Sequence, residues 1–180
     1  MTDNTSEQYN SAITKCRKIF VDKMHDYGTA WRILRPKSIT DQIYIKACRI
    51  RSIEEKGKSK VNEGIRPEFA GMINYSVMAL IQLELGSAEE PHMDEAIVSA
   101  KYDEYTTKAH KLMGDKNHDY SEAWRQMRIS SITDIILMKL LRIKQIEDNK
   151  GITKISEGLD ANYFDIINYS AFALILLDQK

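Results

Sequence analysis

Apolar residues along the chain recur at intervals of three and four positions, which is the spacing of one face of an α-helix. This pattern predicts helices over about residues 7–23, 38–57 and 67–85, and again over 94–116, 133–149 and 161–178. Proline and glycine, which punctuate strands and hairpins, are sparse, with three prolines and eight glycines in 180 residues. The sequence therefore predicts an all-α fold.

Polar residues and glycines mark where these helices begin and end. Ser38 and Thr40 offer side-chain oxygens that can cap the second helix, and Pro67 suits the first turn of the third. Gly86 follows the third helix and suits its C-terminal cap. After the first helix we expect a brief helical turn that places Trp31 in the core.

The sequence contains a tandem duplication. The octet HDYGTAWR, which begins at His25, returns as HDYSEAWR from His118, and these octets contain both tryptophans. The match covers roughly seventy positions, of which about thirty are identical, with a one-residue insertion in the second copy. We predict a first helical repeat over residues 1–86, a connector over 87–93 and a second helical repeat over 94–180. Three helices and a short turn make a poor independent bundle, so the two homologous repeats should form one compact helical bundle around a pseudo-two-fold axis.

Composition and charge narrow the range of partners. The 26 basic and 26 acidic residues cancel, so no overall field attracts nucleic acid, and we expect no nucleic-acid partner. Cys16 and Cys48 are replaced by Ala109 and Leu141 in the second copy, as is typical of small packing residues rather than metal ligands. No basic region followed by an apolar stretch begins the chain, and the most apolar run, 163–177, is too short for a bilayer. We expect a cytoplasmic protein without a membrane segment, and association into a homodimer stays open.

Repeated cations are the first candidates for ligand binding. Lys46 and Arg49 are three residues apart, as are Lys139 and Arg142, so each pair projects from one helix face among apolar neighbours. Such cations extend to water, pair with a carboxylate such as Asp41 and its counterpart in the second repeat, or hold an anionic ligand. Their repetition in both copies favours a specific role.

The octets carry a repeated set of polar and aromatic side chains. These are His25, Asp26, Trp31 and Arg32 in the first repeat and His118, Asp119, Trp124 and Arg125 in the second. A histidine and a carboxylate beside a tryptophan and an arginine can form a pocket that stacks a base and holds a phosphate. In the alternative interpretation, Tyr27 and Trp31 fill the core, while Asp26 caps the following turn and pairs with Arg32. That alternative does not explain why histidine occurs in both copies.

The last helix carries polar side chains at three-residue steps on an otherwise apolar surface, namely Asn162, Asp165 and Asn168. Such a ridge is hydrogen-bonded internally or points at a ligand. The first copy keeps Asn74 opposite Asn168 but has Gly71 opposite Asp165. The two repeats therefore cannot carry chemically equivalent sites.

Few carboxylates suit a divalent cation. Asp165 and Glu157 are the candidates for a magnesium site and for catalysis, because Mg²⁺ needs only one or two carboxylates when a nucleotide supplies phosphate oxygens. Glu54 and Glu55 stand beside lysine near a helix end, which is typical of a solvated charge run.

The motifs K-x-H-D-Y, A-W-R, S-I-T-D, K-x-x-R-I and D-I-I-N-Y-S together resemble the nucleotide-modification-associated domain family, a group of bacterial and phage domains. The resemblance covers nearly the whole chain, twice, and implies an all-helical fold and a link to nucleotide or modified-base metabolism. The helix arrangement is also similar to the all-α nucleoside triphosphate pyrophosphohydrolases, which bind magnesium through paired ExxE and ExxD signatures. The equivalent second helices here carry Lys46 with Arg49 and Lys139 with Arg142 instead.

Two functions follow from these observations. In the first, the protein binds a nucleotide of nucleotide or modified-base metabolism: helical cations hold its phosphates, Trp124 or Tyr120 abuts its base, and magnesium polarises the phosphate for hydrolysis. In the second, the chain is a non-catalytic helical adaptor or oligomerisation module in which the repeated polar residues bind one another. The residues expected to contact the nucleotide are His25, Asp26, Trp31, Arg32, Lys46, Arg49, Asn74, His118, Asp119, Trp124, Arg125, Lys139, Arg142 and Asn168.

Overall fold

A computed structural model describes residues 3–57 and 64–179 of the chain. Over these ranges it contains six α-helices, two short 3₁₀ helices and no strand, so the all-α prediction is confirmed. The elements are α1 (Asp3–Tyr27), η1 (Ala30–Ile33), α2 (Pro36–Lys56), α3 (Arg66–Leu85), α4 (Glu95–Tyr120), η2 (Ala123–Gln126), α5 (Ile129–Asp148) and α6 (Leu159–Asp178).

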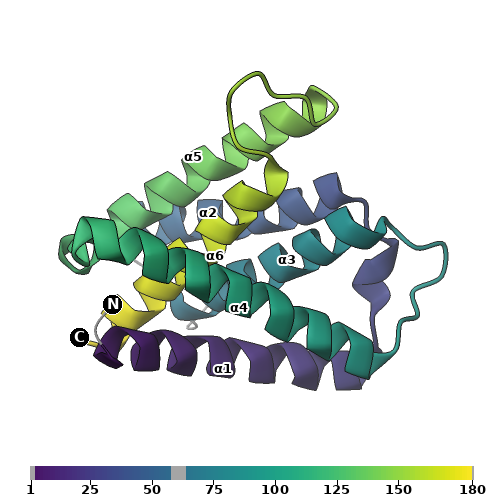
Figure 1. Cartoon of the computed structure of the whole chain (residues 1–180), viewed down its shortest axis with the longest axis horizontal. Coiled ribbons are helices and arrows are strands. Elements are labelled where there is room, and N and C mark those ends of the chain that lie inside the picture. Colours follow the sequence, from purple (N-terminus) through teal and green to yellow (C-terminus); the bar gives the residue numbers. More distant parts are fainter. Residues whose placement is uncertain (1–2, 58–63, 180) are drawn as a thin grey trace.

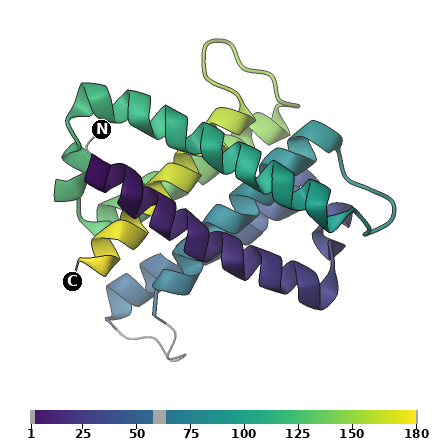
Figure 2. The ribbon, with the colours of Figure 1, turned by 60° about the horizontal axis from the view of Figure 1, so that its bottom comes forward.

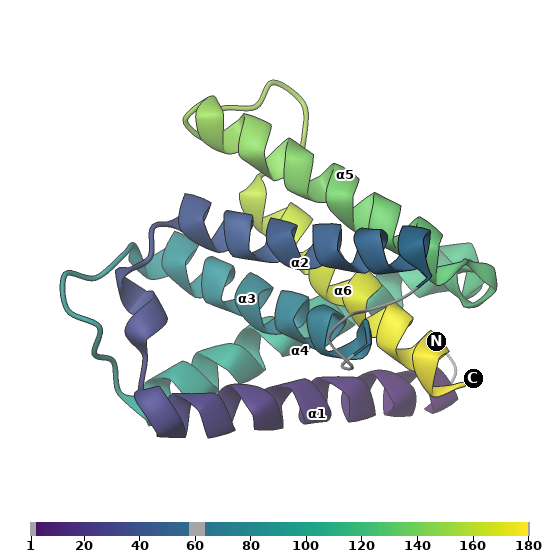
Figure 3. The same cartoon turned by 180° about the vertical axis from the view of Figure 1, so that it is seen from behind.

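The helices form three layers, with α3 and α6 in the middle. In Figure 1, α4 passes in front of these central helices and α1 runs along their lower edge; with the bottom turned forward, α1 and α4 lie side by side in front of them (Figure 2). From behind, α2 and α5 cover the opposite side (Figure 3). Because α3 and α6 also contact each other along their length, the two repeats share one core.

The central position of α3 and α6 follows from their composition. A helix that is apolar on every side is stable only when it is surrounded by other elements. Phe69, Met72 and Ile73 of α3 are fully buried, as are Ile166 and Ile167 of α6. The outer helices have a polar face and need cover on one side only.

Buried hydrogen bonds between the repeats follow a pseudo-two-fold pattern. The Tyr9 hydroxyl of α1 donates to Oδ1 of Asn168 at 2.7 Å, and the equivalent Tyr102 hydroxyl of α4 donates to Oδ1 of Asn74 at 2.8 Å. Each bond joins one repeat to the other, and all four side chains are buried. The predicted pseudo-two-fold arrangement of the repeats is therefore confirmed.

The same symmetry relates α2 to α5. The Thr40 hydroxyl donates to Oε1 of Glu147 at 2.7 Å, and the Thr133 hydroxyl donates to Oε1 of Glu54 at 3.1 Å. Burial raises the pKa of Glu54 and of Glu147, and the threonine hydrogen bonds only partly offset this effect. The expectation that Glu54 belongs to a solvated charge run is therefore wrong, because the carboxylate binds across the repeat interface.

Ion pairs also cross from α2 to α5 at the surface. Lys144 Nζ lies 2.7 Å from Oδ1 of Asp41, and the equivalent Arg51 lies 3.7 Å from Asp134. The alternative in which Asp41 and Asp134 pair with the repeated cations of their own helices is therefore wrong.

The helix ends differ from the sequence-based expectation at the same two places in each repeat: the first helix runs further, to Tyr27 and Tyr120, and the second begins earlier, at Pro36 and Ile129. Helix α2 begins at Pro36, and the Thr40 hydroxyl binds the Pro36 carbonyl and Glu147, so neither Ser38 nor Thr40 is the N-cap. Helix α1 runs to Tyr27, so the His-Asp-Tyr segment is its last turn rather than part of the following loop.

Two other expectations on the chain course are confirmed. Gly86 ends α3 with a positive φ of 73° and binds the Gln82 carbonyl, and the tryptophans lie on the short helices η1 and η2 with buried side chains. Among residues 3–57 and 64–179, no helix combines the length and the apolar content needed to span a lipid bilayer.

Candidate functional site

In the first repeat, one buried acid gathers the repeated cations. Glu68 of α3 accepts a hydrogen bond from Lys46 Nζ at 3.3 Å and forms an ion pair with Arg49, both on α2. Of the three roles predicted for these cations, the structure shows pairing with a carboxylate. The acid comes from the neighbouring helix α3.

In the second repeat, Asp165 of α6 takes the corresponding role. Its Oδ2 accepts a hydrogen bond from Lys139 Nζ at 2.5 Å, and its Oδ1 accepts one from Lys116 Nζ at 2.7 Å. Burial alone raises the pKa of Asp165, but the hydrogen bonds and charges of the two lysines outweigh burial and lower it below the ordinary value. Asp165 is therefore a carboxylate held between two ammonium groups.

The acid occupies different positions in the two repeats. Glu68 corresponds to Asn162, and Gly71 corresponds to Asp165, so the acid has moved by three residues, or about one helical turn. As a result, Lys23 of α1, the counterpart of a lysine that binds Asp165, makes no ion pair with any other described residue. Lys23 nonetheless lies on α1 at the position that Lys116 has on α4, and it lies beside the same cavity as Gly71.

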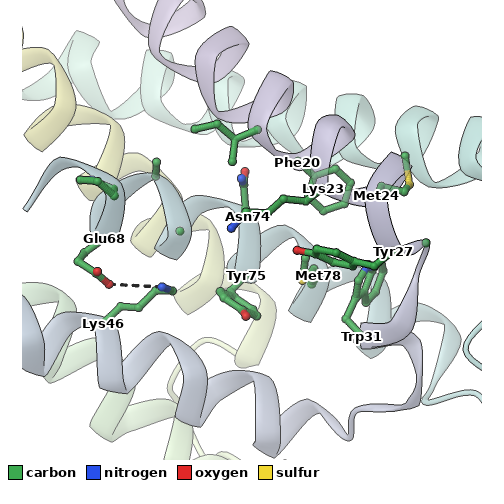
Figure 4. A pocket seen from close by; sticks show the side chains of 15 residues that line it. Phe20, Lys23, Met24, Tyr27, Trp31, Lys46, Glu68, Asn74, Tyr75 and Met78 are labelled. Carbon is green, nitrogen blue, oxygen red and sulfur yellow. Dashed lines mark hydrogen bonds and ion pairs between the residues drawn. The ribbon is translucent and has the colours of Figure 1, made fainter. Parts of the chain in front are cut away.

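A cavity of about 490 Å³ lies in the first repeat between α1, η1, α2 and α3. Figure 4 shows that its lining divides into two ends. Tyr27, Trp31 and Met78 lie together at an apolar and aromatic end, whereas the Lys46–Glu68 pair lies at the other. The Tyr27 side chain is 61% exposed and so forms part of the rim of the cavity.

The charged end of the cavity is built around a glycine. A Cβ atom at Gly71 would lie 2.8 Å from Cε of Lys46, so the lysine chain extends across a backbone position that has no side chain. Lys46 Nζ lies 5.7 Å from the ring centroid of Tyr75, which separates the two ends. Lys23 also lines the cavity, and two lysines therefore border it.

The equivalent region of the second repeat is filled by its own side chains. Phe172 of α6 stacks on Trp124, with ring centroids 4.2 Å apart and an interplanar angle of 6°. Phe172 corresponds to Met78, and Asp165 corresponds to Gly71. Both Phe172 and Asp165 are buried.

The predicted histidine and aspartate pairs do not line the cavity. His25 and Asp26 are exposed on the last turn of α1, and His118 and Asp119 are exposed on the last turn of α4. A contact of 3.3 Å joins His118 Nδ1 to Asp119 Oδ1 at the surface. The structure therefore does not bring these four side chains together with the tryptophans that follow them.

The two arginines of the octets bind protein groups. Arg32 is buried and donates to the Gly86 carbonyl at 2.8 Å, so it does not form the predicted pair with Asp26. Arg125 donates to Glu122 at 2.8 Å and to Gln8 at 2.8 Å, which joins η2 to α1. Both guanidinium groups therefore connect elements of the fold.

The repeated asparagines connect helices. Asn74 Nδ2 donates to the Cys16 carbonyl at 3.1 Å, and Asn168 Nδ2 donates to the Ala109 carbonyl at 3.0 Å. Asn74 also borders the cavity, so it is the one asparagine of this pair placed beside it.

The predicted magnesium ligands lie on different elements. Glu157 is exposed in the loop between α5 and α6 and lines a second pocket, of about 550 Å³, together with Lys139, Arg142 and Asn162. Both oxygens of Asp165 instead bind lysines. Within the part of the chain that the structure describes, no group of three or more His, Cys, Asp or Glu side chains is arranged to hold a metal ion. The magnesium site stays a prediction, and it requires Asp165 to release a lysine.

Sequence reasoning missed Lys23, Glu68 and Tyr75 as members of this region. Lys23 and Lys116 recur in both copies within the motif K-x-H-D-Y, and that repetition was a signal for a shared role. Tyr75 is also repeated, as Tyr169, but its position between two helices depends on how α2 packs against α3.

The fold and this region define a class of protein, an all-α tandem repeat in which a place that is open as a cavity in the first repeat is filled by side chains in the second. The chain belongs to the family described as nucleotide modification associated domain 1, which matches residues 23–83 and 116–177. The two matched segments begin at the equivalent residues Lys23 and Lys116, which agrees with the duplication. No curated protein and no solved structure matches the chain, so the likeness to the pyrophosphohydrolases has no support from these comparisons.

Proposed function

We propose that the cavity of the first repeat binds a nucleotide, with the base at the aromatic end and the phosphate at the lysine end. The observation that carries this proposal is the combination of an aromatic end and a cationic end within one cavity (Figure 4). A nucleotide has the same division into a flat apolar base and an anionic phosphate. The family's association with nucleotide modification supports the same class of ligand.

The size and lining of the cavity suit a small molecule. Ligand sites typically enclose about 300–1,000 Å³ and combine an apolar lining with a few polar groups that fix orientation. The cavity of about 490 Å³ lies within that range, and its polar side-chain groups belong to Lys23, Tyr27, Trp31, Lys46, Glu68, Asn74 and Tyr75. The tyrosine ring at the rim can cover a base that lies against Trp31.

The charges at the lysine end favour an anion. Lys23 and Lys46 each carry one positive charge, and Glu68 supplies one negative charge that Arg49 also shares. A phosphate beside these ammonium groups forms charge-assisted hydrogen bonds, which are roughly twice as strong as neutral ones.

Calorimetric titration of the wild-type chain with nucleosides, nucleoside monophosphates and nucleoside triphosphates tests this proposal. We expect one binding event per chain, about ten-fold weaker in Lys23→Gln, because the loss of one charge-assisted hydrogen bond of about 1.5 kcal/mol corresponds to about that factor. Lys18→Gln is the matched control, because Lys18 lies on the same helix, is exposed and pairs with Asp22 away from the cavity. Equal affinities for the two variants would contradict the phosphate position.

A second pair of variants identifies the repeat that binds. Tyr27→Ala removes an aromatic ring from the rim of the cavity, so we expect the affinity to fall by about two-fold to ten-fold, since aromatic pairs contribute about 0.5–1.5 kcal/mol. Tyr120→Ala removes the equivalent ring of the second repeat. A loss of affinity in Tyr120→Ala with none in Tyr27→Ala would place the ligand in the second repeat and contradict the proposal.

The sequence-based expectation of magnesium-dependent hydrolysis stays a prediction for the same experiment. Nucleoside triphosphates are incubated with the protein with and without Mg²⁺, and the products are separated by chromatography. The prediction requires phosphate release that depends on Mg²⁺ and is abolished in Asp165→Asn. Release that is equal in the variant excludes Asp165 as a metal ligand.

The alternative is a helical adaptor that binds no nucleotide. Its support is the internal pairing of many repeated polar residues, such as the cross-repeat bonds of Tyr9 and Tyr102. The adaptor requires that no nucleotide of the panel gives a heat of binding or raises the melting temperature. Binding by any of them that Lys23→Gln weakens excludes it.

A further inference from the structure

The two repeats differ at two positions that face the same place in each. On the central helices, Gly71 and Met78 of the first repeat correspond to Asp165 and Phe172 of the second. Gly71 and Met78 border the open cavity, whereas Asp165 and Phe172 are buried. The second repeat therefore shows which side chains fill the place that is open in the first.

At the charged end, the second repeat fills the place with a carboxylate. Lys116 and Lys139 hold Asp165 at 2.7 Å and 2.5 Å. Their counterparts in the first repeat, Lys23 and Lys46, both border the cavity, where Gly71 supplies no acid. The Lys46 chain extends across the Cβ position of Gly71, so it must shift to admit a ligand. An oxyanion beside Gly71 would then meet Lys23 and Lys46, the counterparts of the two ammonium groups that Asp165 meets.

At the aromatic end, the second repeat fills the place with a flat ring. Phe172 lies parallel to Trp124 at 4.2 Å, which is the geometry of a base stacked on an indole. In the first repeat Met78 stands in its position beside Trp31, and both border the cavity. A flexible thioether can yield to a planar ligand more readily than a stacked ring can.

We propose that Asp165 and Phe172 are internal stand-ins for the phosphate and the base of the ligand, so that the second repeat is a self-occupied copy of the site in the first. This proposal rests on the proposed function. It assigns the ligand of the first repeat as a nucleoside monophosphate, with its base between Trp31 and Met78 and its phosphate beside Gly71, between Lys23 and Lys46.

The spacing and the neighbouring charges favour one phosphate over three. Asp165 and Phe172 are seven residues apart on α6, about 10.5 Å along the axis, which a nucleoside monophosphate can span. Beyond Gly71, one turn further along α3, the buried carboxylate of Glu68 follows. Further phosphates in that direction would meet a like charge, which is unfavourable in a partly desolvated site.

A different explanation is an exchange of packing. The first repeat has Phe20 on its outer helix α1 where the second has Met113 on α4, so the phenyl ring could have changed helix while the core volume stayed the same. This explanation accounts for Phe172 but not for the charges: the acid of the first repeat, Glu68, lies one turn away and leaves Lys23 without an ion pair to a described residue, whereas Asp165 pairs with both of its lysines. It also predicts that no second ligand binds when Phe172 is made smaller.

The test exchanges the two positions between the repeats. The opened variant, Asp165→Gly with Phe172→Met, should bind two nucleoside monophosphates per chain by calorimetry, against one for the wild type. The closed variant, Gly71→Asp with Met78→Phe, should lose binding by at least about 100-fold, because both halves of the ligand are displaced, each worth about ten-fold. Lys46 must shift in the closed variant, which its flexible chain permits.

The outcomes separate this proposal from the proposed function. One binding event in both the wild type and a folded opened variant overturns the stand-in proposal and leaves the proposed function intact. No binding by the wild type overturns the proposed function, and the stand-in proposal, which rests on it, fails with it.

The fold of each variant is measured by circular dichroism and thermal melting. If the opened variant does not fold, the closed variant decides, because wild-type affinity in a folded closed variant overturns the proposal. Tighter binding of triphosphates than of monophosphates overturns the assignment of the ligand class.

Discussion

Two buried tyrosine hydroxyls provide a direct test of the pseudo-two-fold core. Tyr9 and Tyr102 are 1% and 0% exposed, and each donates its hydroxyl to an asparagine oxygen of the other repeat. Tyr9→Phe and Tyr102→Phe remove only the oxygen and leave the Oδ1 atoms of Asn168 and Asn74 without this donor. A buried acceptor that loses its partner costs about 1–3 kcal/mol.

We take about 1.5 kcal/mol for each substitution, since the ring stays packed and no large cavity forms. With an urea m-value of about 2 kcal/mol/M, each variant should lower the unfolding midpoint by about 0.7 M. The hydroxyls share no partner, so the double variant should lose about 3 kcal/mol, or about 1.5 M in the midpoint. Urea titrations followed by circular dichroism measure these shifts.

Tyr105→Phe is the control for this prediction. The Tyr105 hydroxyl donates to Glu84 at 2.5 Å, and because that carboxylate is exposed, water can replace the hydroxyl. We expect its midpoint to change by less than about 0.3 M, within the range of surface substitutions. The symmetric arrangement would be refuted if the shift of the unfolding midpoint in Tyr9→Phe differed more than two-fold from the shift in Tyr102→Phe. Shifts no larger than that of the control would refute it as well.

Three further predictions concern charge and helix ends. Asp165→Asn should lower the free energy of unfolding at neutral pH and reduce the loss of stability at acid pH. The pKa of Asp165 is lower in the folded protein than in the unfolded chain, so its carboxylate stabilises the fold above the unfolded pKa. This stabilisation is lost as the pH falls through the folded pKa. Denaturant titrations from pH 2 to 7 measure this, and an unchanged acid limb contradicts it. Glu147 has a raised pKa in the folded protein, so the free energy of unfolding should fall as the pH rises from the ordinary glutamate pKa through the folded one. Glu147→Gln should remove this dependence on pH. A dependence that persists in the variant excludes Glu147 as its source. Gly86→Ala should lower the free energy of unfolding by about 1 kcal/mol, because the positive φ of 73° is unfavourable for a residue with a Cβ atom. Gly57→Ala, at a φ of 63°, tests the same effect at the end of α2. No loss of stability in either variant contradicts the cap assignments.

The helices could be predicted from the sequence because the signal for a helix is local. The apolar spacing within each segment placed all six helices, and the repeated octet placed the short helices with their tryptophans. The start of α2 was missed because Ser38 and Thr40 resemble caps, whereas Pro36 begins the helix. The Thr40 hydroxyl instead binds Glu147 across the repeat interface, which no local pattern can indicate.

The candidate site was predictable only in part. The sequence placed Lys46 and Arg49 on one helix face, and it identified Gly71 against Asp165 as a difference between the repeats. It did not identify Glu68 as the partner of the cations, nor Lys23 as a member of the site. These assignments depend on which helices become neighbours.

The sequence by itself determined the all-α class, the duplication and the chemical inequality of its two halves, because each of these is written in residue types and in their spacing along one chain. Only the tertiary structure decided that Asp165 and Phe172 fill, in the second repeat, a place where the first repeat has a cavity bordered by Gly71 and Met78. The physical reason is that charge pairing, stacking and open volume arise between helices, where the crossing of α3 and α6 with their neighbours fixes which side chains meet.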